Sequence, residues 1–216
     1  MVDSSMEFKD YIKAGATLFA AFLGATFAFR LNDNKEKRKE SLKNKESLNF
    51  AMFTLARQAN AISTTKNGFS RFNSEFELAF NMPAYKNPEY KDLIQNFDDL
   101  AFILESGDPQ TLMDLTVEQE RFEQAMSAIS IRNEFYVNEF QPLLEKHKLN
   151  KRRVTAEEAE ALLGERVFNA CIQGATEMKG HVFESEISLL KMHKKLFEMA
   201  KELYPGHSFV KWENQA

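Results

Sequence analysis

The chain has 216 residues, of which 44% are hydrophobic and 28% are charged, and its formal net charge is -4. These proportions are typical of a folded protein and exclude a largely disordered one. Glycine and proline number only 8 and 5, which is too few for the many turns of an all-β fold, and the negative charge argues against general nucleic-acid binding. A single cysteine, Cys171, excludes an intramolecular disulfide, and we expect it to be a small buried hydrophobic side chain.

A long apolar run lies near the N-terminus. Residues 14–29 carry no charge, and the roughly 21 residues of 11–31 make about 31 Å of helix, which matches a hydrocarbon core of roughly 30 Å. Lys13 and Arg30 flank the run, where long side chains reach the headgroups. The alternatives are a buried helix of a soluble domain and a cleaved signal peptide. The run has no polar stripe, however, and acidic residues outnumber basic ones before it. We predict a short extracytoplasmic N-terminus at 1–10 and a transmembrane helix at 11–31.

Basic residues follow the predicted membrane helix and form a juxtamembrane segment at 32–47, whereas only two lysines, Lys9 and Lys13, precede the apolar run. Because positive charge stays on the cytoplasmic side, we predict a single-pass protein of a bacterial inner membrane, with its N-terminus outside. The same residues can contact anionic lipid headgroups, or they can be a solvated helix face that also carries Glu36 and Glu40. The residues assigned to topology and headgroup contact are Arg30, Lys35, Lys37, Arg38 and Lys39.

One face of the predicted membrane helix carries small residues at every fourth position, namely Ala16, Ala20, Gly24 and Ala28. Small residues let two helix backbones approach closely in a bilayer. The alternative is that alanine and glycine are simply common in membrane helices. We predict a homo-oligomer that associates through this face.

Helical spacing continues through 48–204, which we predict to be a cytoplasmic helical bundle. Apolar residues recur at steps of three and four through 48–80, and two prolines interrupt the pattern at 81–88. Pro88 is suited to the first turn of a further helix, whose apolar residues run from Leu93 to Leu104.

The pattern stops and restarts at residues 106–109, where glycine, aspartate and proline supply a C-cap, an N-cap and a first helical residue. The next helix has apolar residues at helical spacing from Leu112 to Phe140, and we expect Pro142 to kink its end.

A basic connector at 146–153 then precedes Thr155 and Glu158, whose spacing is that of a capping box. Apolar and small residues repeat from Gly164 to Leu203 with a period of about 3.5 residues, which is typical of coiled-coil packing. A proline and a glycine end this helix and leave a C-terminal tail at 205–216.

Together the pattern predicts an all-α fold, with an N-terminal transmembrane helix followed by an antiparallel helical bundle with coiled-coil-like packing. Three polar residues, Gln119, Asn133 and Ser185, fall within the apolar seams. They can set the register of the helices or line a ligand pocket.

No catalytic motif is present: the chain has no glycine-rich phosphate loop, no H-E-x-x-H and no C-x-x-C. Glu177, His181 and Glu184 share a helix face, but they would need a ligand from another helix to hold a metal. We therefore expect no enzyme and no cofactor. Basic clusters at 35–45, 146–153 and 191–195 can surround an anionic ligand or remain solvated. The candidate residues for a small anionic ligand are Lys151, Arg152 and Arg153.

Four stretches resemble a loose set of bacterial proteins that combine one membrane helix with a helical domain and have no assigned activity. This resemblance implies a shared fold and assigns no site residue. The layout is also similar to that of some membrane effectors of bacterial defence, which respond to a nucleotide signal or a phage component. The stretches are LNFAMFTLARQANAI (48–62), DDLAFILE (98–105), EQERFEQAMSAISIRNEF (118–135) and LYPGHSFVKW (203–212).

Two functions follow as hypotheses. The first is a non-enzymatic, membrane-anchored scaffold that self-associates and engages an unidentified cytoplasmic protein. The second is a membrane effector, in which a small anionic ligand of the nucleotide type reorganises the bundle and the anchor perturbs the bilayer.

Overall fold

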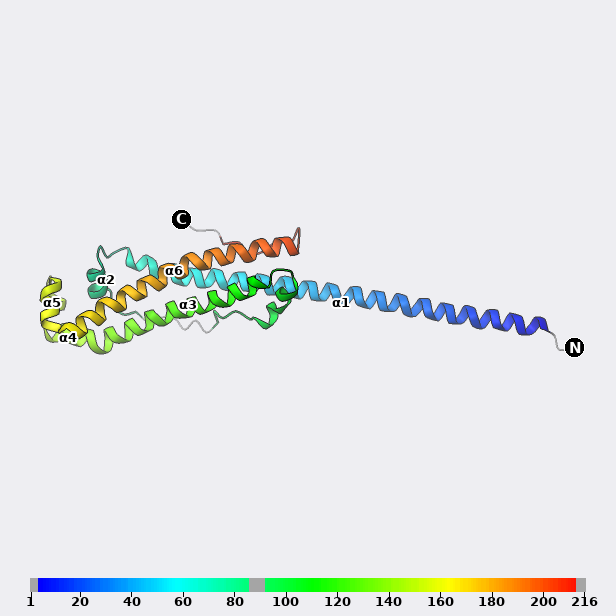
Figure 1. The fold of residues 1–216 in the computed structure, drawn as a ribbon, viewed down its shortest axis with the longest axis horizontal. Coiled ribbons are helices and arrows are strands. Elements are labelled where there is room, and N and C mark those ends of the chain that lie inside the picture. Colours follow the sequence, from blue (N-terminus) through cyan, green and yellow to red (C-terminus); the bar gives the residue numbers. More distant parts are fainter. Residues whose placement is uncertain (1–3, 86–91, 213–216) are drawn as a thin grey trace. The chain divides into compact units, whose positions relative to one another are not determined.

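The computed structural model describes residues 4–85 and 92–212, and every regular element in these two ranges is helical (Figure 1). The all-α prediction is therefore confirmed. The chain divides into two compact units, an N-terminal unit of Met1–Glu46 and a C-terminal unit of Ser47–Ala216. Pro88, the predicted start of a helix, lies outside the described residues.

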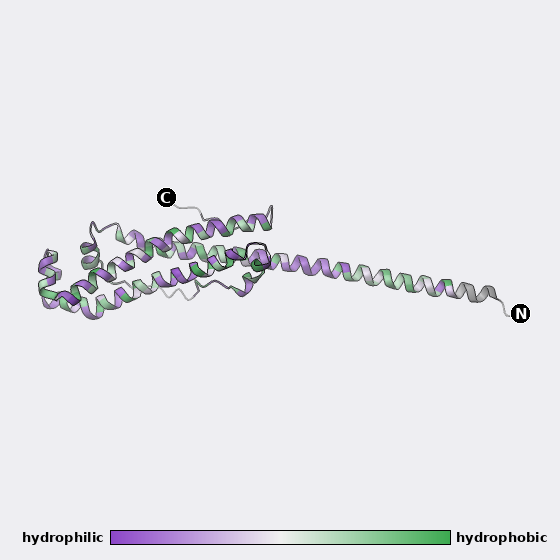
Figure 2. Cartoon of the chain, in the orientation of Figure 1, coloured by the Kyte–Doolittle hydropathy of each residue, from purple (hydrophilic) through white to green (hydrophobic). Residues whose placement is uncertain are grey.

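The first element, α1, is a single helix over Ser4–Phe69, and its first part makes up the N-terminal unit. It is long and apolar enough to cross a membrane, with an 18-residue window whose mean hydropathy is 1.6. Figure 2 shows this apolar stretch followed along the helix by a hydrophilic one. The predicted membrane segment 11–31 and juxtamembrane segment 32–47 therefore belong to one continuous helix.

The C-terminal unit contains the rest of α1 and a series of further helical elements. These elements are α2 (Glu75–Asn81), the 3-10 helix η1 (Asp98–Glu105), α3 (Pro109–Phe135), the π-helical turn η2 (Tyr136–Phe140), α4 (Gln141–Lys146), the 3-10 turn η3 (Leu149–Lys151), α5 (Ala156–Leu163) and α6 (Glu165–Leu203).

Several helix ends lie where their capping residues predict. Helix α3 begins at Pro109, whose missing N–H costs nothing in a first turn. The Thr155 hydroxyl accepts a hydrogen bond from the Glu158 amide at 3.3 Å and so caps α5. Helix α6 ends at Leu203, just before the proline and glycine of the tail.

Two elements differ from the sequence prediction. Residues 93–96 are not helical, and only a 3-10 helix follows them. The cause is a set of long-range side-chain bonds: the Gln95 amide donates to Gln119 at 3.2 Å and its side chain donates to the Ala51 carbonyl at 3.2 Å. The last predicted helix is split at Gly164, where φ is +79°, a left-handed value that favours glycine and ends α5 before α6 begins.

Helices α3 and α6 pack side by side in opposite directions (Figure 1). Asp114, near the start of α3, binds Lys195 near the end of α6 at 2.7 Å, and Glu139, just after α3, binds Arg166 near the start of α6 at 3.0 Å. The last part of α1 also contacts α6, because Ser63 donates to Glu186 at 2.8 Å. Coiled-coil-like interdigitation of these helices remains a prediction.

Candidate functional site

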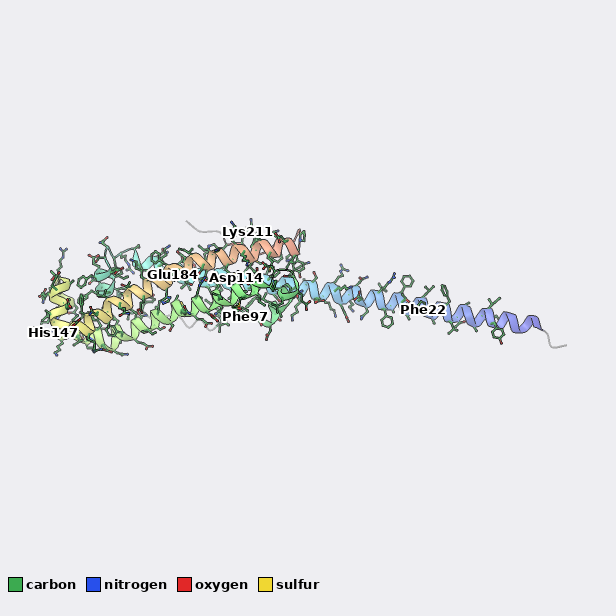
Figure 3. The ribbon with its side chains drawn as sticks, viewed as in Figure 1. Phe22, Phe97, Asp114, His147, Glu184 and Lys211 are labelled. Atoms are coloured by element: carbon green, nitrogen blue, oxygen red, sulfur yellow. The ribbon has the colours of Figure 1, made fainter. Side chains whose placement is uncertain are left out.

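The small-residue row of the predicted membrane helix is fully exposed. Ala16, Ala20, Gly24 and Ala28 all lie on the surface of α1, and a side chain added at Gly24 would meet no atom within 4 Å. Figure 3 shows the neighbouring Phe22 side chain projecting outward from the same helix. The row is therefore free to pack against another helix, and its role in self-association stays a prediction.

The five basic residues assigned to headgroup contact are also exposed. Among them, Lys37 forms an ion pair: its Nζ lies 2.8 Å from the Asp33 carboxylate, whose hydrogen bond and charge raise the pKa of Lys37. Arg30, Lys35, Arg38 and Lys39 lie on the surface of α1. Their contact with lipid headgroups stays a prediction.

A cleft of about 570 Å³ lies in the C-terminal unit between α2 and the segment that runs from η3 to the start of α5. Of the three residues predicted to bind an anion, Arg152 and Arg153 line this cleft and Lys151 does not. We name it the arginine cleft. Its lining consists of Ser74, Phe76, Glu77, Phe80, Asn81, Leu149, Arg152, Arg153, Val154, Thr155 and Ala156.

The backbone around the two arginines is shaped by a turn at Lys148, which has a left-handed φ of 56°. The short turn η3 follows, and the backbone is extended at Arg152 before α5 begins. Arg152 then binds Glu158 of α5 at 2.6 Å, with both side chains about half exposed. Arg153 is exposed, and no ion pair is recorded for it among the described residues.

On the opposite side of the arginine cleft, α2 begins with a reciprocal cap. The Ser74 hydroxyl accepts from the Glu77 amide at 3.1 Å, and the Glu77 carboxylate accepts from the Asn73 amide at 2.8 Å. The arrangement is similar to a capping box, except that the Glu77 carboxylate binds the amide of the residue before the N-cap, Ser74. It holds the Glu77 carboxylate in place at the wall of the cleft through one oxygen, Oε2.

A second cleft, of about 260 Å³, lies between α3 and α6 and includes Glu118, Arg121, Ser188 and Lys191. We name it the Glu118 cleft. Glu118 is only 3% exposed; it accepts hydrogen bonds from Ser188 at 2.5 Å and from Arg121 at 3.4 Å. Burial raises the pKa of Glu118, and the hydrogen bond from Ser188 and the charge of Arg121 only partly oppose this shift.

The third basic cluster of the sequence is divided by the fold. Lys191 and Lys195 line the Glu118 cleft, whereas Lys194 lies 3.8 Å from Glu198 on the surface. His193 is 5% exposed, and burial lowers its pKa. Of this cluster, the fold therefore brings Lys191 and Lys195 together in one cleft and leaves Lys194 outside its lining.

Replacing Glu118 by glutamine should raise the free energy of unfolding at pH 7 by on the order of 1 kcal/mol. The pKa of Glu118 in the folded state is above its ordinary value of 4.5, which applies to the unfolded state. At a pH between the two pKa values the folded state therefore binds more protons than the unfolded state, and the free energy of unfolding falls as the pH rises through this interval. The gain from Glu118→Gln should therefore vanish below about pH 4.5. Urea unfolding of the full chain in detergent can be followed by Trp212, the single tryptophan, which packs against the core.

Asp114→Asn serves as a control of opposite sign. Hydrogen bonds from Lys195 and Gln110 lower the pKa of Asp114, so its stabilising effect exists above its ordinary pKa and is lost as the pH falls. This variant should be slightly less stable than the parent at pH 7. A loss of stability in Glu118→Gln at neutral pH would contradict the argument from burial.

The seam residues Gln119 and Asn133 bind backbone segments. Gln119 accepts from the Gln58 side chain at 2.8 Å, and both glutamines donate to the Leu93 carbonyl. Asn133 donates to the Tyr85 carbonyl at 2.8 Å. These contacts attach irregular segments to α3, which supports a role in register. Ser185 is buried, and its hydroxyl has no recorded partner among the described residues.

A buried arginine on α3 was missed by the sequence analysis. Arg132 is 4% exposed and donates to the carbonyl oxygens of Ala79, Met82 and Pro83 at the end of α2. Its guanidinium also lies 4.7 Å from the centre of the Tyr136 ring. Burial lowers the pKa of Arg132. In the sequence it is a charged residue beside an apolar seam, which is ordinary for a helix surface, so nothing in the pattern marked it.

Cys171 is buried, whereas the acidic and histidine residues that share one face of α6 are exposed. Cys171 is buried, donates to the Ala79 carbonyl at 3.4 Å, and has its pKa raised to about 12 by burial, which disfavours the reactive thiolate. Glu177, His181 and Glu184 are exposed on α6. In the two described ranges, no group of three or more His, Cys, Asp or Glu residues is placed to hold a metal.

No family model, curated protein or solved structure matches this chain. The candidate sites therefore rest on the geometry described above. The arginine cleft is supported by a cavity that two of the predicted residues line. The small-residue row is supported only by its exposure and by the sequence pattern.

Proposed function

We propose that the chain is a non-enzymatic, membrane-anchored helical protein that self-associates and presents its C-terminal unit to a partner protein in the cytoplasm. The observation that carries this proposal is the apolar window of α1, which has a mean hydropathy of 1.6 and is not buried at all. Leaving so much apolar surface in water is unfavourable. A bilayer would cover it.

The orientation and the form of the C-terminal unit are part of the proposal. Basic residues after the apolar window favour a cytoplasmic C-terminal unit in a bacterial inner membrane. The opposed directions of α3 and α6 support an antiparallel bundle, and the 3.5-residue repeat of α6 supports coiled-coil-like packing. The test is a C-terminal fusion to a topology reporter that works only outside the cytoplasm. Activity of this reporter would contradict the orientation.

If the chain self-associates through the small-residue row, larger side chains in this row should weaken the association. Replacing Ala20 and Gly24 together by leucine should weaken association by at least about tenfold, roughly 1.4 kcal/mol, because the helix backbones could no longer approach closely. Cross-linking of the full chain in native membrane vesicles, over a range of expression levels, would measure this. If the variant associated as strongly as the parent chain, the small-residue row would not be an association surface, and the helix would act only as a membrane anchor.

Gly15→Leu is the matched control for the change at Gly24. The two glycines are nine positions apart, and at 100° per residue they lie on opposite sides of the helix. A side chain added at either position meets no atom within 4 Å. We expect Gly15→Leu to leave association within about twofold of the parent, because only the row of Ala20 and Gly24 is a close-packing face.

A second function is favoured by the arginine cleft. Two of the three predicted anion-binding residues line a cavity of about 570 Å³, which is within the size range of ligand pockets. The chain would then be a membrane effector that responds to a small anionic ligand, for example in bacterial defence. If charge reversal at Arg152 and Arg153 left every ligand-dependent membrane effect unchanged, this function would be excluded.

A further inference from the structure

The arginine cleft has room for more than a small inorganic anion. A volume of about 570 Å³ is that of a pocket for a whole small molecule, since such pockets span roughly 300–1,000 Å³. The cleft also has two chemically different walls. One wall carries Arg152 and Arg153 with the start of α5, and the other carries Ser74, Glu77 and Asn81 of the α2 region.

The basic wall is suited to a phosphate group. Guanidinium groups bind phosphate through paired, charge-assisted hydrogen bonds, and no partner is recorded for Arg153 in the described part of the chain. Arg152 already binds Glu158 at 2.6 Å, but both side chains are about half exposed, so this pair is weak and can be exchanged. The nearby start of α5 adds a favourable helix-dipole field, which the carboxylates of Glu157 and Glu158 in its first turn partly cancel.

The opposite wall would repel a ligand that carried negative charge over its whole length. Glu77 is held there through Oε2 by the Asn73 amide, and its other oxygen, Oε1, has no recorded bond among the described residues. An ionised carboxylate only accepts hydrogen bonds, and an amide or a hydroxyl can both donate and accept. Glu77, Asn81 and Ser74 therefore suit a ligand with hydroxyl groups at this end.

We propose that the arginine cleft binds a sugar phosphate, that is, a phosphate monoester on a small hydroxyl-rich body. The phosphate lies against Arg153 and Arg152, where it displaces Glu158 from Arg152. The hydroxyl groups lie against Glu77 and Asn81. The proposal deepens the second function above and rests on it only for the anionic character of the ligand.

Calorimetric titration of the full chain in detergent micelles, in a buffer free of phosphate, tests the ligand class. The three probes are ribose 5-phosphate, inorganic phosphate and ribose. We expect ribose 5-phosphate to bind at least tenfold more tightly than either of the others, because only it can use both walls at once. If inorganic phosphate binds as tightly as ribose 5-phosphate, or if neither phosphate compound binds, the proposal is overturned.

Variants locate the site within the basic cluster. Arg153→Gln should weaken the binding of ribose 5-phosphate by about tenfold, the usual scale for one charge-assisted contact. Lys151→Gln is the matched control, since it removes the same charge two residues away and outside the lining of the cleft. Equal losses in the two variants would show that binding follows only the net charge of the segment, which would overturn the proposal.

Two acidic variants give effects that damage to the fold cannot imitate. Glu158→Gln frees Arg152 from its ion pair, so ribose 5-phosphate should bind severalfold more tightly. Glu77→Gln should weaken ribose 5-phosphate while leaving inorganic phosphate unchanged or tighter, because the change removes a repulsive charge and replaces a charged acceptor of hydroxyl groups by a weaker, neutral amide. Unchanged affinity in both variants would contradict the proposed placement of the ligand.

A titration of the full chain in dye-filled vesicles separates this site from the proposed effector function. Tight binding of ribose 5-phosphate to vesicles that contain the full chain, without any change in leakage of an enclosed dye, would support the site and exclude the effector function. Absence of binding would overturn the site. The anchored interaction function would be unaffected by that result, because it is tested by variants of the membrane helix.

Discussion

Replacing Phe19 and Phe22 together by arginine should move the chain from the membrane fraction into the soluble or aggregated fraction. Both side chains are more than 60% exposed near the middle of the apolar run. Phenylalanine favours a membrane helix, whereas an arginine near the centre costs about 2.5–3.5 kcal/mol, so the double change costs roughly 6 kcal/mol of insertion free energy. Carbonate extraction followed by immunoblotting would measure the distribution.

Leu42→Arg is the control for this prediction. Leu42 lies on the same helix, α1, and is 55% exposed, but it falls outside the apolar run. Its replacement should leave the chain in the membrane fraction. If the double arginine variant stayed in the membrane fraction after extraction, the apolar run would not be the anchor, and the proposed function would lose the observation that carries it.

Replacing Arg132 by alanine should destabilise the C-terminal unit by at least about 3 kcal/mol. The change removes charged hydrogen bonds worth roughly 1.5–3 kcal/mol each and leaves carbonyl oxygens at the end of α2 without their donor. Relief from burying the charge offsets only part of this loss. Amide hydrogen exchange should show the protection of α2 lost first, and urea unfolding followed by Trp212 fluorescence should give the size of the change.

Arg132→Lys should recover little of the lost stability, because a compact ammonium lacks the planar fork that serves several carbonyl oxygens at once. Arg166→Ala is the matched control. Arg166 is also an arginine in an ion pair, but its side chain is 76% exposed, so its loss should cost no more than about 1 kcal/mol. Similar losses for Arg132→Ala and Arg166→Ala would show that the contacts at the end of α2 do not stabilise the unit.

Local signals predicted many of the element ends. Pro109 and Thr155 mark helix starts in the sequence and in the structure, because a missing N–H and a hydroxyl acceptor act within one turn of their own position. Residues 93–96 show the opposite case. Their apolar spacing is helical, but Gln95 is held by Ala51 and Gln119, partners 44 and 24 residues away, and no local pattern contains such contacts.

The arginine cleft, too, was predictable from local sequence only in part. A run of basic residues at 151–153 indicated an anionic ligand, but the sequence could not separate the three. The fold places Arg152 and Arg153 at the wall of a cleft and leaves Lys151 outside its lining. The partner of Arg152 and the opposing Glu77 come from α5 and from α2. Which face a short turn presents depends on the dihedral angles of Lys148 and Arg152, and these are set by packing.

The sequence by itself determined the all-helical class and the apolar window of α1, because hydrophobic periodicity and the length of an uncharged run are properties of consecutive residues. Only the tertiary structure decided which charged residues are buried and which share a cavity. Arg132 and Glu118 are 4% and 3% exposed although each resembles an ordinary surface charge in the sequence. Their burial follows from contacts with α2 and α6, helices that lie far from them along the chain.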